Sequence, residues 1–146
     1  MSRLPRHLEH LRTAFNAEAM SAASYRAYAE QAEAAGKTNL AQRWRAMAAE
    51  KDRLAGELLT AAGKVEIEAA NLRDAIAEEL YEREVLYPRM IDDMEHLGQA
   101  GEAALLRRLV QAHEQHRAEL DDLRRELTAS TRDVRPPAAA PAAKAG

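Results

Sequence analysis

The chain has 146 residues, of which 47% are hydrophobic, 4% aromatic and 31% charged, and its net charge at pH 7 is −3. This length suits one domain, and the mixed, slightly acidic charge argues against a nucleic-acid-binding protein with a basic face. The absence of cysteine excludes disulfides, cysteine-ligated metals and thiol chemistry. No apolar run approaches the ~20 residues of a membrane span, and the N-terminus lacks a signal-peptide core. We therefore expect a cytoplasmic protein that binds neither membranes nor nucleic acid.

The first half of the chain predicts two antiparallel helices joined by a tight turn. Alanine is abundant, whereas the β-branched and aromatic residues that favour strands are scarce. The first helix is expected over residues 5–35, with Gly36 as its stop. The second is expected over residues 38–62, with Thr38 or Asn39 as its N-terminal cap.

The second half predicts another pair of helices. The third helix is expected to begin between residues 66 and 71 and to end at residue 97, before Gly98. Pro88 lies inside it and should kink it, because proline lacks a backbone N–H and crowds the preceding turn. The fourth helix is expected over residues 101–128. The Ala- and Pro-rich stretch 129–146 has no apolar period, which predicts a disordered tail.

Residues 1–128 are therefore predicted to form one all-α domain, an antiparallel four-helix bundle with internally duplicated helix pairs. The stretch LRTAFNAE in the first helix resembles LRDAIAEE in the third. The second helix similarly overlays the fourth, so that Lys51 falls on His113 and Leu54 on His116. Such a repeat predicts a pseudo-twofold bundle around one core.

Each predicted helix carries a stripe of apolar residues along one face, at intervals of three or four residues. Ionisable residues interrupt this apolar seam near the middle of each helix. Antiparallel packing brings the helix midpoints to one level, so we expect these side chains to form one buried layer. Burying an unpaired charge costs several kcal/mol, and the layer must therefore neutralise itself or bind a ligand. The layer contains Glu18, Lys51, Glu79, Glu82, His113 and His116.

Two interpretations of this layer remain open. Three carboxylates and two imidazoles are a suitable ligand set for Fe, Mn or Zn, and with Lys51 and one divalent ion the charges balance. The alternative is a metal-free network of ion pairs in which Lys51 bridges Glu18 and Glu79 and one carboxyl is protonated. The predicted metal ligands are Glu18, Glu79, Glu82, His113 and His116.

Residues 8–125 resemble the ferritin-like domain of the rubrerythrins. The resemblance is carried by HLRTAFNAEAMSAASYRAYAEQAEAAGKTNLAQRWRAMAAEKDRLAGELL, by NLRDAIAEELYEREVLYPRMIDDMEHLG with its Tyr-Pro step, and by AHEQHRAEL. Such bundles hold a di-iron site made of one Glu from each of two helices and a Glu-x-x-His from each of the other two.

The resemblance implies roles for several residues of this chain. Glu18 and Glu79 match the two single-glutamate positions, and Glu82 matches the extra glutamate of the rubrerythrins. Tyr25 and Tyr87 match tyrosines that the family places beside the irons. The resemblance also implies a homodimer.

The two Glu-x-x-His positions depart from the family pattern. Lys51 and Leu54 stand at one of them, and His113 and His116 at the other. One iron position thus lacks two ligands, and the lysine ammonium would repel a cation. This predicts a degenerate di-iron site that holds one metal through His113, His116 and Glu79, with Lys51 as an internal counter-charge.

The predicted function is that of a rubrerythrin-type metal-binding protein with a mononuclear site. Iron is the expected metal, with Mn or Zn as substitutes, and the expected activity is an oxidoreductase reaction linked to O2 or peroxide. Because the chain lacks the cysteine-ligated rubredoxin module, electrons must come from an external donor. The alternative is a metal-free, non-catalytic helical bundle that acts as a structural or interaction protein.

Overall fold

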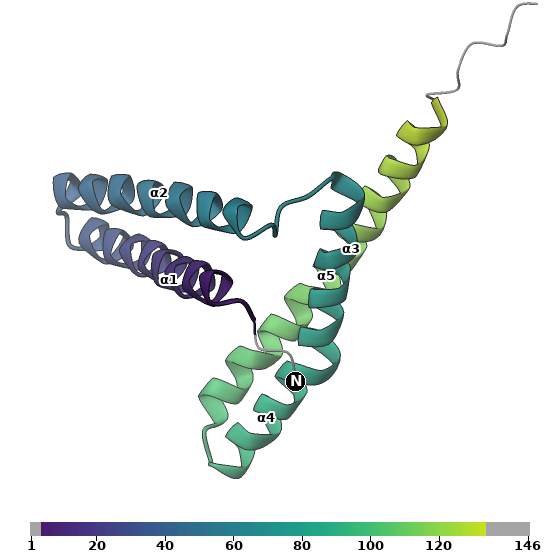
Figure 1. The fold of residues 1–146 in the computed structure, drawn as a ribbon. Helices are drawn as coiled ribbons and strands as arrows, with labels where there is room; N and C mark the ends of the chain where they lie inside the picture. Colours follow the sequence, from purple (N-terminus) through teal and green to yellow (C-terminus); the bar gives the residue numbers. More distant parts are fainter. Residues whose placement is uncertain (1–3, 134–146) are drawn as a thin grey trace, which may run out of the picture. The chain divides into compact units, whose positions relative to one another are not determined.

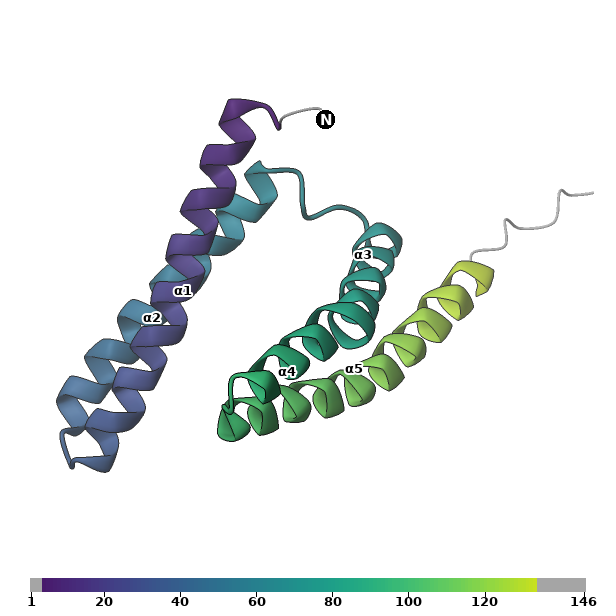
Figure 2. The ribbon, with the colours of Figure 1, turned by 90° about the horizontal axis from the view of Figure 1, so that it is seen from below.

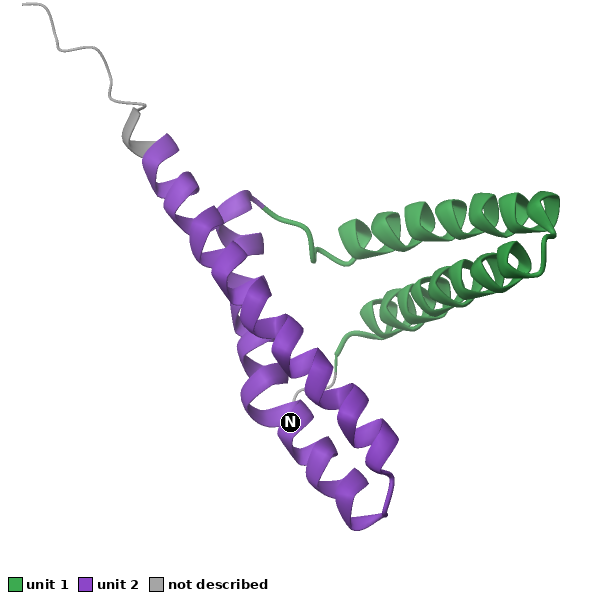
Figure 3. Ribbon diagram, turned by 180° about the vertical axis from the view of Figure 1, so that it is seen from behind, with its two compact units in different colours: residues 1–66 green, residues 67–146 purple. Residues whose placement is uncertain are grey.

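The chain is organised as two compact units, residues 1–66 and 67–146 (Figure 3). The computed structural model describes residues 4–133. Every regular element in this described part is a helix, which confirms the predicted all-α class. None of these helices combines the length and the apolarity needed to cross a membrane.

Unit 1 is a hairpin of two antiparallel helices, α1 (Arg6–Ala34) and α2 (Thr38–Ala61), which lie side by side in Figures 1 and 2. The turn between them depends on Gly36, whose φ of 72° is a left-handed conformation that glycine adopts without steric cost. After Gly36, the N–H of Lys37 donates to the carbonyl of Ala32 at 2.8 Å and closes the helix end. The predicted glycine stop is confirmed.

The predicted N-terminal cap of α2 is wrong. Thr38 is already the first helical residue, so the cap position falls on Lys37, which makes no side-chain capping hydrogen bond. A lysine side chain has only N–H donors and cannot accept a bond from the first N–H groups of a helix.

The interior of unit 1 is made of alanine. The helices can approach closely because the buried side chains are small, and most of them recur at intervals of seven residues. Leu40 and Met47 are each 44% exposed, so the facing helix of unit 1 does not cover them. A helix in a hairpin has one neighbour in its own unit, and that neighbour covers only a narrow stripe. The buried residues are Ala22, Ala29, Ala32, Ala41, Ala48 and Ala55.

Unit 2 is also an antiparallel hairpin. Its first arm is continuous and consists of α3 (Glu68–Tyr81), the π-helical segment η1 (Glu82–Leu86) and α4 (Tyr87–His96). Its second arm is α5 (Ala100–Asp133), which runs back alongside the first arm (Figures 1 and 2). These arms match the predicted third and fourth helices.

The end of α5 differs from the prediction. The helix continues to Asp133, whereas we expected it to end at Thr128. Residues 129–133 are therefore helical, and assigning them to a disordered tail was wrong. The sequence there, Ala-Ser-Thr-Arg-Asp, contains neither glycine nor proline to stop the helix. The rest of the predicted tail, residues 134–146, lies outside the described residues.

The disturbance predicted at Pro88 takes the form of the π-helix directly before it. The N–H of Tyr87 donates to the carbonyl of Glu82, five residues back instead of four. Pro88 follows as one of the first residues of α4, where its missing N–H costs least. One extra residue is thus accommodated between Glu82 and Tyr87, on the stretch that carries the predicted ligands.

Candidate metal centre

Unit 2 brings four of the predicted site residues together. Glu79 lies near the end of α3, Glu82 begins η1, and His113 and His116 lie three residues apart on α5. Residues three apart project from the same face of a helix, so the two imidazoles face the two carboxylates across the hairpin. Unit 1 carries the other two charged members of the predicted layer, Glu18 and Lys51.

The closest grouping consists of Glu79, His113 and His116. One ligand atom from each residue lies within 4.8 Å of the other two. Nδ1 of His116 is 3.3 Å from both oxygens of Glu79, and Nε2 of His113 is 3.5 Å from Glu79 Oε2. Ligand atoms lie ~2.0–2.2 Å from a zinc ion, so two of them are at most ~4.4 Å apart. This group could hold a metal ion after small side-chain movements.

His113 is the most constrained residue of the group, with only 7% of its surface exposed. Nδ1 lies 2.7 Å from the carbonyl oxygen of Leu109, and Nε2 lies 2.7 Å from Oε2 of Glu82. A carbonyl and a carboxylate both accept hydrogen bonds, so Nδ1 carries a proton and a second proton lies between Nε2 and Glu82. The bond to Glu82 raises the pKa of His113, against the opposing effect of burial, and the bond to Leu109 adds to the increase.

This orientation is also the one that a metal-ligating histidine needs. Ligating histidines donate their other ring N–H to a carbonyl or carboxylate, which fixes the ring and its tautomer. The bond from Nδ1 of His113 to Leu109 does this, and it directs Nε2 toward Glu79 and Glu82. A metal ion at Nε2 would take the place of one proton.

Tyr87 packs against His113, next to the predicted ligands. The ring centroids are 5.3 Å apart and the planes meet at 81°, an edge-to-face contact. Burial raises the pKa of the Tyr87 hydroxyl, and the negative charges of Glu82 and Glu79 raise it further. The hydroxyl therefore stays protonated over a wide pH range.

An open hollow of about 330 Å³ adjoins the group on one flank of the hairpin. Carboxylates line it, which favours the approach of a cation. We call it the acidic hollow, and it is lined by Ala75, Glu78, Glu79, Glu82, His116, Glu119 and Leu120.

In unit 1, Lys51 and Glu18 form an ion pair. Lys51 Nζ lies 2.9 Å from Glu18 Oε2, and the two side chains are 29% and 25% exposed. The interaction with Glu18 raises the pKa of Lys51, so its ammonium stays charged. Lys51 thus has a carboxylate partner, as its predicted role as a counter-charge requires.

Tyr25 belongs to an aromatic cluster in the same unit. Its ring lies 4.9 Å from that of Trp44 and 6.1 Å from that of Tyr28, measured between centroids. The Tyr28 and Trp44 rings are 5.2 Å apart and nearly perpendicular. In unit 1, Tyr25 therefore has a packing role between α1 and α2.

Two features of the site were missed by sequence reasoning. The first is the π-helix at Glu82, for which Pro88 was the available signal. The second is Arg83, which is only 9% exposed and pairs with Glu84 at 2.8 Å and Glu114 at 3.3 Å. Its signal was its position four residues after Glu79, which places both side chains on the same face of the helix.

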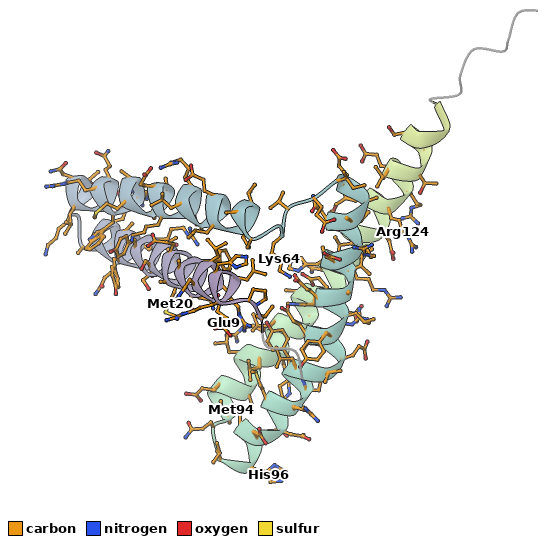
Figure 4. All side chains as sticks on the ribbon, in the orientation of Figure 1. Glu9, Met20, Lys64, Met94, His96 and Arg124 are labelled. Carbon is orange, nitrogen blue, oxygen red and sulfur yellow. The ribbon has the colours of Figure 1, made fainter. Side chains whose placement is uncertain are left out.

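His96 is a histidine of unit 2 that lies apart from the proposed ligands. It lies at the end of α4 (Figure 4), where Nδ1 donates to the carbonyl of Asp92 at 2.8 Å. A histidine at the C-terminus of a helix interacts favourably with the exposed carbonyls. It therefore offers a matched control for the histidines of α5.

Comparisons with known proteins do not assign the chain to a family. Neither the family models nor the curated proteins with which the sequence was compared match it. The function of the chain is therefore inferred from its own side chains.

Proposed function

We propose that the protein binds one divalent transition metal through Glu79, His113 and His116. The observation that carries this proposal is the orientation of His113, whose Nδ1 is held by Leu109 while Nε2 faces the carboxylates. The three ligand atoms lie within 4.8 Å of one another. A buried imidazole held in this way needs either a proton or a metal ion at its second nitrogen.

The donor set fits the proposal chemically. Two imidazoles and one carboxylate are a recognised ligand set for mononuclear Fe(II), and Mn or Zn are bound by the same atoms. When bound, iron in such a set supplies open positions for O2 or peroxide. Glu82 would accept the proton that leaves His113, and Tyr87 would hold the His113 ring in place.

The proposal includes a specific arrangement of the helices, an antiparallel four-helix bundle of the rubrerythrin type. It is supported by the many large apolar side chains that the hairpins leave uncovered, such as Met20 at 71% and Tyr81 at 52% exposed. Burying such side chains stabilises a fold by about 1.5–3 kcal/mol each, and a bundle of both hairpins would bury a share of them. In that bundle the pair of Glu18 and Lys51 would lie at the level of the metal ligands.

The same proposal includes an oxidoreductase activity that uses O2 or peroxide. Electrons would come from an external donor, because the chain contains no cysteine for a rubredoxin-like centre. The homodimer and the cytoplasmic location remain predictions of the sequence.

A second candidate is a metal-free structural bundle with a salt-bridge layer. The observation that favours it is that the charged groups already have partners, as Lys51 pairs with Glu18 at 2.9 Å and His113 with Glu82 at 2.7 Å. In this alternative His113 stays an imidazolium, and the layer of charged side chains only stabilises the fold.

Metal analysis separates the two candidates. The protein is expressed in media supplemented with iron, manganese or zinc, and the bound metal is measured beside the variants His116→Ala and His96→Ala. We expect about one metal per chain in the wild type and in H96A, and almost none in H116A. A wild-type protein without bound metal in every medium overturns the metal proposal and leaves the salt-bridge bundle.

A further inference from the structure

A second hollow opens on the opposite flank of the α3–α5 hairpin. Its volume is about 150 Å³, and it shares Glu79 and Leu120 with the acidic hollow. Side chains turn ~100° per residue around a helix, so the remaining residues of the two hollows fall on opposite sides of Glu79 and Leu120. We call it the arginine hollow, and it is lined by Ile76, Glu79, Leu80, Arg83, Arg117, Leu120 and Asp121.

The two arginines differ in how their charges are satisfied. Arg83 is nine-tenths buried; its Nε–H donates to Glu84, and its terminal nitrogens form ion pairs with Glu84 and Glu114. A guanidinium has five N–H donors, so these contacts leave at least two of them available. Arg117 makes no hydrogen bond or ion pair with the described residues. The hollow therefore offers an unpaired cation beside a buried one.

Neither acidic residue of the hollow is paired with Arg117. Asp121 pairs at 3.4 Å with Arg124, which does not line the hollow. Glu79 is turned toward the histidines, with both oxygens 3.3 Å from His116. An anion at Arg117 would have Glu79 and Asp121 as negative neighbours in the hollow, and a metal ion on Glu79 would neutralise one of these two charges.

The walls and the size of the hollow define the rest of the ligand. Ile76, Leu80 and Leu120 supply the apolar surface. An enclosed apolar cavity of ~150 Å³ holds benzene, so this hollow, which is open to solvent on one side, can take up the body of a ligand no larger than one such ring. A guanidinium next to such walls suits a carboxylate on a short apolar body, because the carboxylate accepts two parallel N–H bonds.

We propose that the arginine hollow binds a small organic carboxylate, with Arg117 and Arg83 holding the carboxylate and the apolar walls holding the body. Because Glu79 borders both the hollow and the metal group, this carboxylate would bind next to the metal ion of the proposed function. That neighbourhood rests on the proposed function, whereas the affinity of the hollow for carboxylates does not.

The test is an NMR titration of the full chain with benzoate, in which the chemical shifts of the Leu80 and Leu120 amides report binding. We expect saturable shifts, binding about tenfold weaker in Arg117→Gln, and unchanged binding in Arg108→Gln. Arg108 is exposed on the same helix, outside the residues that line the hollow, so R108Q matches the change in charge. Equal affinity in R117Q and wild type, or equal affinity for benzoate and uncharged benzamide, overturns the proposal.

A second variant fills the hollow without touching a charge. Leu80 is 51% exposed, so Leu80→Trp can be tolerated by the fold, and it should abolish benzoate binding. Benzoate that binds L80W as tightly as wild type contradicts this location.

Zinc distinguishes the two proposals from each other. We expect zinc-loaded protein to bind benzoate several-fold more tightly than chelated protein, because the charge of Glu79 is neutralised. If zinc binds and the benzoate affinity does not change, the proposed coupling between the hollow and the metal fails while the metal site stands. If zinc does not bind, the proposed metal function fails. The benzoate titration of the chelated protein then still tests whether the hollow binds a carboxylate.

Discussion

Unit 1 and unit 2 are built alike but treat their charged groups differently. Each is an antiparallel hairpin that turns at a left-handed glycine and buries mainly alanine among its apolar residues. In unit 1 the charged group is a pair of opposite charges, Lys51 and Glu18. In unit 2 it consists of carboxylates that face imidazoles, and both kinds of side chain can ligate a metal ion. A lysine ammonium cannot ligate a metal ion while it is charged, whereas a neutral imidazole can.

The largest expected effect comes from making unit 2 resemble unit 1. In His113→Lys, an ammonium would face Glu79 and Glu82, and it cannot ligate a metal while it is charged. We expect the affinity for Zn²⁺ or Fe²⁺ to fall at least a hundredfold, as measured by calorimetric titration. His96→Lys adds the same charge at the end of α4 and should bind metal as the wild type does. Retained affinity in H113K would remove His113 from the ligand set.

The next largest effect concerns the ion pair of Lys51 and Glu18 in unit 1. Lys51→Met leaves the carboxylate of Glu18, whose Oε2 is buried, without its partner and should lower the melting temperature measured by circular dichroism. The double variant Glu18→Gln/Lys51→Met carries no unpaired charge and should melt above K51M. If K51M melts at the wild-type temperature, the pair does not contribute to stability.

A third effect is the pH dependence of the metal-free protein. The folded state raises the pKa of His113 through its bond to Glu82. The resulting stabilisation is complete below the unfolded pKa near 6.5 and is lost as the pH rises through the higher folded value. The contribution of His113 should therefore favour a higher melting temperature at pH 6 than at pH 8 when metal is chelated.

Two variants serve as controls for this pH effect. His113→Gln should reduce the difference between the melting temperatures at pH 6 and pH 8, because glutamine does not titrate. Lys51→Met should leave the difference unchanged, since Lys51 stays charged throughout this range. An equal pH effect in wild type and H113Q would contradict the assignment to His113.

The smallest effect is expected at Tyr87. Tyr87→Phe keeps the ring edge against His113 and removes only the hydroxyl. We expect the unfolding free energy to change by about 0.5 kcal/mol and the metal affinity to stay the same. A large loss of metal affinity in Y87F would show that the hydroxyl, and not the ring, supports the site.

Local signals in the sequence predicted most of the elements. The glycines at positions 36 and 98 both adopt φ of 72° and end helices, because few other residues tolerate that backbone conformation. The grouping of Glu79 with His113 and His116 was also predictable, since residues three apart share a helix face and short turns make helices antiparallel.

The missed features depend on packing that periodicity does not describe. A helical template assumes a constant turn per residue, so it cannot place the extra residue between Glu82 and Tyr87. The interface between α1 and α2 is filled by alanines, which an apolar pattern does not distinguish from the larger apolar residues at neighbouring positions. Arg83 was overlooked because an arginine among glutamates resembles a solvated surface residue in the sequence.

The π-helix has a consequence for how this site can change by insertion or deletion. Loss of one residue within 82–86 would rewind η1 as a regular α-helix and turn everything before it by ~100° relative to everything after it. Glu79 would then point away from α5, while Tyr87 would keep its place beside His113. A single deleted codon could thus separate the carboxylate from the histidines with every amino acid of the group still present.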